Sequence, residues 1–429
     1  MLNKKILFIF FFAFLIRLIA LNQSLWLDEA VTANVVKNFD FTQIISKFSP
    51  TDFHPPLYYL FMKVWTNFFG YSEIALRMPS ILFSLMTGYI IYLIGGVWAM
   101  AFFLFNPLIV YYSQEARMYM MVTFLLTVAL YYYLKNKNQI FFGIFIYLAF
   151  LTFYGSIFLI VSFLIYYLYK KNYKFFILNT LYFILIILLI SPLLYQQLIN
   201  SKVALSQVTN WSLVLGKANL KDLLLIPVKF SIGRISFYPK WLYWGIAGGW
   251  TGFVLFTIKT VLNKTVFIKT VLYLLIFPLF LGFVVSFFVP ILQYFRFIYL
   301  IPIMSILLAK KNVTPYHYGV TIGFMIFALV YLLLPQFHRE NWKGLVFNLP
   351  KNIPVYMIEA SSDPVKYYDR SIKVKRLESI KESKEREIIV IPYATEVYGL
   401  DYKSLLVKSG YNLKKEISFR EVTYERWLR

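Results

Sequence analysis

The chain has 429 residues, of which 60% are hydrophobic and 21% aromatic, with a net charge of +23. Apolar runs long enough to cross a ~30 Å hydrocarbon core recur along it, which excludes a water-soluble globular enzyme and predicts a mainly α, polytopic transmembrane helical bundle. In such a chain, positive charge reports topology and contact with anionic membrane lipids, so we expect no nucleic-acid partner. Cysteine is absent, which excludes disulfides and thiol chemistry.

The first apolar run follows Lys4 and Lys5 and ends near Leu21. Because no small-residue cleavage site follows it, we interpret this run as a retained first span. Lysines gather on one side of the later runs, and the positive-inside rule makes that side cytoplasmic. We predict about eleven spans, near residues 5–21, 74–94, 97–112, 117–134, 140–153, 156–169, 175–195, 240–259, 266–288, 294–309 and 316–334. The two short runs beside Tyr154 could instead form one bent or re-entrant element.

The first predicted outer loop, residues 22–73, contains two expected interfacial helices. One starts at Asp28 and runs towards Phe39. The other, residues 57–69, is too short to span the bilayer but has apolar residues at helical spacing. The pair Pro55-Pro56 opens this second helix and Gly70 closes it.

The composition changes after Pro335, where 13 of the 20 acidic residues lie. Residues 355–358 and 388–391 are predicted to be buried strands, 395–409 a helix, and 417–419 part of a closing strand. We therefore predict two domains: a membrane module, 1–335, and a small water-soluble α/β domain, 336–429. The span count places this second domain on the same side as the first outer loop.

Before Pro335 the chain has only seven carboxylates, six of them between Asp28 and Glu115. Carboxylates near a membrane are costly unless they are solvated or paired, so this cluster marks a candidate site, although an ordinary solvated loop would also account for it. No Gly-rich phosphate loop and no zinc-ligand spacing occur. Chemistry at the outer face therefore needs an activated substrate already present there, such as a lipid-linked phosphate ester, together with a base and cations.

Four sequence blocks occur in an order that resembles a known family. They are LWLDE (25–29), HPPLYY (54–59), ALRMPS (75–80), and NP followed by YYSQEARMY (106–119). Weaker similarities are YFR (294–296) and RENW (339–342). Together they resemble the GT-C type glycosyltransferases that use lipid-phosphate sugars, which include protein O-mannosyltransferases and bacterial aminoarabinose transferases.

The resemblance implies Asp28 as the catalytic base and Glu115 as a second acidic residue that orients the acceptor or a divalent cation. The alternatives are that Asp28 only begins a helix as a favourable N-terminal charge, and that Glu115 only pairs with Arg117 or Arg77. Because Asp28 and Glu29 are about 100° apart on a helix, only one of them can point into the site.

Cations at the same face are the candidates for the lipid phosphate. Arg77 is the first choice, with a snorkelling anchor as its alternative role. Behind it we place Arg117, Arg296, His54 and Lys63. His54 stands where some relatives have a basic residue. As acceptor-binding or site-shaping residues we name Glu29, Tyr58, Tyr112 and Gln114. No cofactor is firmly expected; the metal requirement stays open, with Glu115 and His54 as the candidate ligands of a divalent cation.

The sequence thus predicts an inverting glycosyltransferase of the cytoplasmic (inner) membrane with its site on the extracytoplasmic side. It would move a mannose-like hexose or an aminopentose from an undecaprenyl or dolichyl phosphate to a protein, lipid or glycan acceptor. Two alternatives stay open: a flippase or transporter of lipid-linked sugars, and a surface polysaccharide polymerase or ligase. A binding domain on a mere membrane anchor is excluded, because eleven spans are too many for an anchor.

Overall fold

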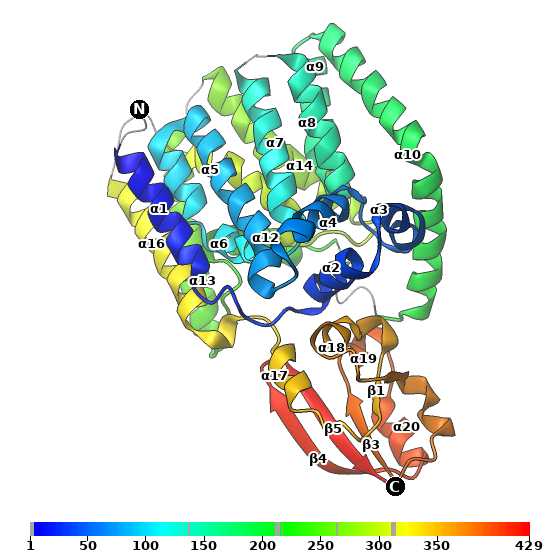
Figure 1. The fold of residues 1–429 in the computed structure, drawn as a ribbon. Helices are drawn as coiled ribbons and strands as arrows, with labels where there is room; N and C mark the ends of the chain where they lie inside the picture. The colour runs from blue at the N-terminus through cyan, green and yellow to red at the C-terminus, as the bar shows by residue number, and fades with distance from the viewer. Residues whose placement is uncertain (1–3, 136–137, 211–214, 217, 263–264, 310–314) are drawn as a thin grey trace.

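The computed structural model describes residues 4–135, 138–210, 215–216, 218–262, 265–309 and 315–429. Helices occupy the chain as far as residue 333, and a mixed sheet with short helices forms the C-terminal end of the molecule (Figure 1). The helices of the first part are α1 (Lys4–Leu18), α2 (Leu27–Asn38), α3 (Phe41–Gln43), α4 (Leu57–Phe69), α5 (Glu73–Leu104), α6 (Pro107–Ser113), α7 (Tyr119–Leu134), α8 (Gln139–Thr152), α9 (Ile157–Tyr169), α10 (Tyr173–Gln207), α12 (Leu220–Ile232), α13 (Lys240–Val261), α14 (Val266–Val285), α15 (Ile301–Leu308) and α16 (Pro315–Leu333).

Four of the described helices, α5, α10, α14 and α16, are long and apolar enough to cross a bilayer. Many of their side chains are apolar and point outwards, as lipid-facing residues do. The chain is therefore a multi-pass membrane protein. Several other apolar helices have fewer than 18 residues, so the count of eleven spans stays a prediction.

The ends of the observed helices agree with one predicted element and differ from another. The predicted helix 57–69 is confirmed as α4, and Gly70 ends it with a φ of 78°. The predicted span 97–112 is wrong as one helix: α5 ends at Leu104, and Asn106 starts α6 by accepting hydrogen bonds from the backbone of Leu108 and Ile109 at 3.0 and 3.2 Å. Helix α12 was not predicted.

The C-terminal sheet has the strand order β2-β1-β3-β5-β4. The strands are β1 (Val355–Met357), β2 (Val374–Arg376), β3 (Glu387–Ile391), β4 (Asn412–Phe419) and β5 (Val422–Leu428). Strand β1 is parallel to β2 and β3, whereas β5 is antiparallel to β3 and β4. The predicted strands are present as β1, β3 and β4.

The helix predicted over 395–409 is wrong as one element. It is two helices, α19 (Thr395–Tyr398) and α20 (Tyr402–Lys408). Gly399 ends α19 in the left-handed region with a φ of 65°, and the Asp401 side chain accepts from the Ser404 backbone at 3.2 Å to begin α20. Helices α17 (Trp342–Phe347) and α18 (Asp363–Tyr368) complete this part.

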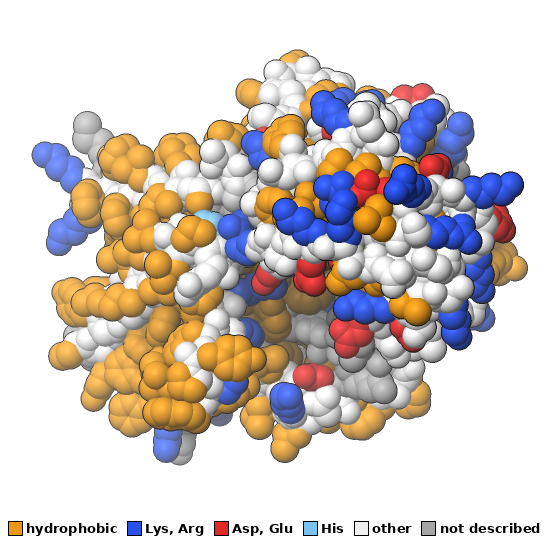
Figure 2. All heavy atoms as spheres, turned by 90° about the horizontal axis from the view of Figure 1, so that it is seen from below, with side chains coloured by type: hydrophobic (Ala, Val, Ile, Leu, Met, Phe, Trp, Pro, Cys, Tyr) orange, Lys and Arg blue, Asp and Glu red, His pale blue; other side chains and the backbone are white. Residues whose placement is uncertain are grey.

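Polar contacts hold the C-terminal part against α2 and the loop that precedes it. The Asn34 side chain of α2 donates to the Asp363 carboxylate at 2.8 Å, and the Tyr368 hydroxyl accepts from the Leu25 backbone at 2.8 Å. Viewed from this end, Lys and Arg gather over the C-terminal part, whereas apolar side chains dominate the helical part (Figure 2). The two parts meet around a cavity.

Candidate functional site

A cavity of about 1100 Å³ lies where the helical part meets the C-terminal part. Its polar lining comes from distant parts of the chain: the start of α2, the loop before α4, helices α6 and α7, the α12–α13 connection, the segment before α15, the segment before α17, the β3–α19 segment and the β4–β5 turn. The polar and aromatic lining residues include Trp26, Asp28, Asp52, Tyr112, Tyr119, Arg234, Tyr294, Arg339, Tyr393, Glu396 and Glu421. The cavity therefore combines acids, arginines and aromatic rings.

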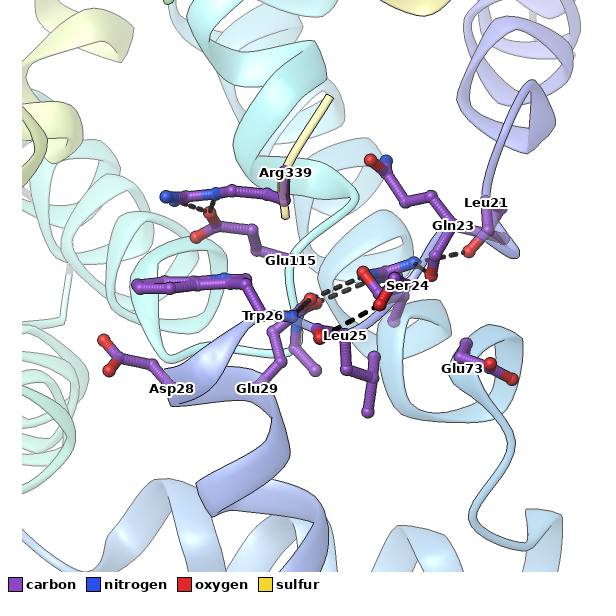
Figure 3. Close-up of polar contacts among 12 residues, drawn as sticks. Leu21, Gln23, Ser24, Leu25, Trp26, Asp28, Glu29, Glu73, Glu115 and Arg339 are labelled. Atoms are coloured by element: carbon purple, nitrogen blue, oxygen red, sulfur yellow. Dashed lines mark hydrogen bonds and ion pairs between the residues drawn. The ribbon is translucent and has the colours of Figure 1, made fainter. Parts of the chain in front are cut away.

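The adjacent acids Asp28 and Glu29 diverge at the first turn of α2 (Figure 3). Asp28 lines the cavity, its side chain is 36% exposed, and Arg117 Nη2 lies 3.3 Å from its Oδ2. Glu29 is fully buried and accepts hydrogen bonds from the backbone of Ala116 at 2.8 Å and of Trp26 at 3.4 Å. Helical geometry therefore presents one carboxylate to the cavity and turns the other inwards.

Arg77 is the buried partner of Glu29. Its Nε and Nη2 donate to the two carboxylate oxygens at 2.8 and 2.6 Å. Its other N–H groups donate to the carbonyls of Leu21, Gln23 and Ser24 at 2.6–3.0 Å. An arginine has five N–H donors, and all five are engaged. Since no donor is left for a phosphate, the structure does not support Arg77 as the phosphate ligand; Arg77 instead fixes the segment that leads into α2.

Glu115 lies in the turn between α6 and α7 and is buried. Its carboxylate accepts from Arg339, with Nε at 3.1 Å from Oε1, and Oε2 has no hydrogen-bond partner among the described residues. Burial raises the pKa of Glu115, although the Arg339 charge opposes this rise. The alternative in which Glu115 pairs with Arg77 or Arg117 is wrong, because Arg339, 224 residues away, is its partner.

Arg339 joins the two walls of the site. Its guanidinium lies 3.9 Å from the ring centre of Trp26 (Figure 3). The β4–β5 turn holds its backbone, because Arg420 Nε donates to the Arg339 carbonyl at 2.7 Å and the Arg420 carbonyl accepts from the Asn341 N–H at 2.9 Å. In the sequence, residues 339–342 showed only a weak similarity to the glycosyltransferase family, and we predicted no role for them.

Arg234 was missed altogether. It lines the cavity, donates from Nη1 to the Tyr111 hydroxyl at 2.6 Å, and has no carboxylate within 4.0 Å in the described part of the chain. The sequence did contain a signal for Arg234. Only five arginines precede residue 335, and lysine carries most of the positive charge in that part of the chain. Arginine is preferred over lysine for planar recognition of phosphate.

The other predicted phosphate ligands are not among the cavity-lining residues. Arg296 reaches the Pro290 carbonyl at 3.5 Å, and its neighbours Tyr294 and Phe295 line the cavity in its place. Lys63 donates to the Val36 carbonyl at 2.7 Å and so ties α4 to α2.

His54 pairs with Asp52 at 3.3 Å, and Asp52 is the one of the two that lines the cavity. Burial favours a higher pKa for Asp52, but His54 and Arg117 outweigh it, so its pKa lies below the ordinary value. Within the described residues, no group of three or more acidic or histidine side chains could hold a metal ion. Glu115 and His54 contact different partners and do not form a shared cation site.

The remaining site-shaping residues differ in position. Tyr112 lines the cavity, while Tyr58 is buried with a hydroxyl that has no partner among the described residues. The Gln114 amide donates to the carbonyls of Arg17 and Ile19 at 2.9 and 2.6 Å, which ties the α6–α7 turn to the end of α1.

Several buried polar atoms around the cavity lack a partner in the described structure. They are Trp26 Nε1, Asp52 Oδ2, Glu115 Oε2 and Arg117 Nε. Unsatisfied buried groups are rare in folded proteins. Their concentration here indicates a site shaped for a polar ligand.

The fold is shared with solved membrane-protein structures over nearly the whole chain. Two of them are crystal structures of ArnT from Cupriavidus metallidurans, one in the apo state and one bound to undecaprenyl phosphate. Each aligns with a TM-score of 0.59 at 11% identity and covers 99% of this chain and 98% of its own. No family model and no curated protein matches the sequence. The likeness establishes an ArnT-like fold.

Proposed function

We propose that this protein is a membrane glycosyltransferase that moves a sugar from a polyprenyl phosphate to an acceptor. The observation that carries the proposal is the cavity itself: the Asp28 carboxylate, paired with Arg117, lines the same cavity as the guanidinium groups of Arg234 and Arg339. A base that shares a cavity with arginines, one of which has no carboxylate partner among the described residues, fits transfer away from a phosphate leaving group. The ArnT-like fold supports the same conclusion, since one ArnT structure is bound to undecaprenyl phosphate.

In the proposed step, Asp28 accepts the proton of an acceptor hydroxyl or amine. The acceptor atom bonds to the anomeric carbon while the bond from that carbon to the phosphate oxygen breaks, and the electron pair leaves with the phosphate. A single in-line displacement inverts the anomeric centre. Arg234 and Arg339 stabilise the departing phosphate, and Arg117 orients the Asp28 carboxylate at 3.3 Å.

Glu115 has a positioning role in this scheme. Its carboxylate holds the Arg339 guanidinium over Trp26, so the cation faces the cavity in a fixed plane. The free Oε2 of Glu115 offers one further acceptor for a substrate hydroxyl. Arg77 and Glu29 support the segment that carries Trp26 and Asp28.

The remaining parts of the proposal come from the sequence. The protein lies in the cytoplasmic membrane, with the cavity and residues 336–429 on the extracytoplasmic side. The donated sugar is a mannose-like hexose or an aminopentose, and the acceptor is a protein, lipid or glycan. The C-terminal part contributes one wall of the cavity and is thus placed to contact the acceptor.

The test uses the purified chain in nanodiscs with radiolabelled polyprenyl-phosphate sugars and a membrane extract as acceptor source. Wild-type protein should consume the lipid-linked label, and Asp28→Asn should lower the rate by at least about 100-fold, as loss of a general base does. Asp40→Asn is the matched control, because Asp40 is exposed and asparagine also caps a helix. Equal rates for wild type and Asp28→Asn would remove Asp28 as the base, and no consumption of any donor would favour the flippase.

A further inference from the structure

A second groove lies outside the cavity, between α12 and α13. It has a volume of about 410 Å³ and is lined by Leu220, Lys221, Leu224, Leu225, Val228 and Trp244. The α12 residues recur every three or four positions, so they form one face of the helix. Leu220 and Leu224 are 66% and 57% exposed, which leaves this apolar face open.

Besides Lys221 in the lining, two cations lie towards the end of the groove where α12 is connected to α13. Lys229 lies one turn beyond Leu225 on α12, and Lys240 lies one turn before Trp244 on α13. Their ammonium groups lie 5.6 and 5.8 Å from the ring centre of the same residue, Tyr243.

These cations have no acidic partner. Among the described residues, no carboxylate lies within 4.0 Å of Lys229, Lys240 or Arg234. Lys229 Nζ donates only to neutral oxygens, the Tyr243 hydroxyl at 3.2 Å and the Ile235 carbonyl at 3.4 Å. Burial, with Arg234 and Lys240 adding to it, lowers the pKa of Lys229 to about 8. A bound anion would relieve this crowding of like charge.

The surroundings match a membrane surface. Tyr238 and Trp241 are 82% and 75% exposed beside Lys240, and exposed aromatic rings of this kind are typical of the headgroup level of a bilayer. Arg234 belongs to the same α12–α13 connection but lines the catalytic cavity. An anion at Lys229 is therefore next to the cavity without being inside it.

We propose that the α12–α13 groove is a loading site for a polyprenyl phosphate, with the hydrocarbon chain along the groove and the phosphate on Lys229 and Lys240, next to Arg234. The carrier role of this lipid rests on the proposed function; the binding site does not. An apolar groove that ends in uncompensated cations complements a lipid that has a long chain and a compact anionic head.

The test measures lipid binding by native mass spectrometry in the Arg234→Gln background, in which the cavity has lost a phosphate ligand. Undecaprenyl phosphate should bind, and the added pair Lys229→Gln and Lys240→Gln should weaken binding by about tenfold or more, as loss of hydrogen bonds to a charged group does. Leu224→Gln should weaken it several-fold. The controls are Lys269→Gln and Leu189→Gln, which replace exposed residues of α14 and α10 with the same side chain.

Three outcomes would overturn the proposal. The double lysine variant could bind as tightly as Lys269→Gln. Phosphatidylglycerol could compete as well as undecaprenyl phosphate, which would make the groove part of a general anionic lipid shell. Inorganic phosphate alone could bind with the same lysine dependence, which would remove the role of the groove.

The transfer assay separates this proposal from the proposed function. If both hold, the double lysine variant raises the donor KM in vesicles and leaves kcat unchanged. If wild-type protein transfers no sugar but loses lipid binding in the double variant, the loading site stands and the transferase proposal falls. If transfer proceeds with an unchanged KM, the transferase stands and the loading site is refuted.

Discussion

The buried pair of Glu29 and Arg77 predicts a large and specific effect on stability. Arg77→Ala removes all five hydrogen bonds of the guanidinium and leaves the Glu29 carboxylate, which is 0% exposed, without its cation. Breaking a buried ion pair from one side costs about 3–5 kcal/mol, because an uncompensated charge stays behind. We expect the free energy of unfolding to fall by that amount.

The substitution Arg77→Lys tests whether the Arg77 side chain stabilises the fold or binds the ligand. Lysine keeps the charge but has three N–H donors, so at least two of the five hydrogen bonds of Arg77 are lost. A hydrogen bond contributes about 0.5–1.5 kcal/mol, and one to a charged group about 1.5–3 kcal/mol, so a loss of about 1 kcal/mol or more is expected.

The assay is chemical unfolding in mixed micelles, with transfer activity measured on the folded fraction. Glu73→Gln is the control: it breaks the pair with Lys343, whose side chain is 45% exposed, and should change stability by less than about 1 kcal/mol. If Arg77→Lys leaves the unfolding free energy unchanged and instead raises the donor KM, Arg77 contacts the ligand and the structural role is refuted.

Three further predictions concern the cavity wall. Arg234→Gln should raise the donor KM or lower kcat at least tenfold, and losing its hydrogen bond to the Tyr111 hydroxyl should lower stability by no more than about 3 kcal/mol; a fall in stability alone would contradict a ligand role. Arg420→Ala should slow transfer with little change in donor KM, because it frees the Arg339 carbonyl held at 2.7 Å, whereas the same change at Arg426, which pairs with Glu387, should not. Burial first and then Glu340 raise the pKa of Glu421. The folded protein therefore holds this proton more tightly than the unfolded chain and gains stability as the pH falls from neutral into the acidic range. Glu421→Gln removes that dependence: its unfolding free energy relative to wild type should increase between about pH 4 and 7, and a difference independent of pH would contradict the assignment.

Local patterns in the sequence predicted the local structure well. The helix over 57–69 is bounded by Pro56 and Gly70, whose backbone preferences act within one turn. The sequence also separated the directions of Asp28 and Glu29, because helical periodicity alone sets the angle between neighbours. Helix α12 was not predicted: it is as short as α4, but it contains Pro227 where α4 has no internal proline.

Long-range pairing could not be read in the same way. Neighbouring arginines at 77 and 117 are the nearest partners for Glu115 along the chain, yet the fold brings Arg339 to it through the β4–β5 turn. The burial of Arg77 depends on three carbonyls of an irregular segment, and no periodic pattern reports where such carbonyls point. Choosing among the arginines required the hydrogen bonds of the folded chain.

The contact between Glu115 and Arg339 has a consequence for biogenesis. The two residues are 224 positions apart, so a ribosome adding about 5–20 residues per second makes the second about 10 to 45 s after the first. Throughout that interval the nascent chain already carries Asp28 in the membrane but lacks the guanidinium that lies over Trp26. The cavity wall that Arg339 forms is thus completed late in translation, and a chain that ends before residue 339 contains Asp28, Trp26 and Glu115 but lacks the cation that pairs with Glu115.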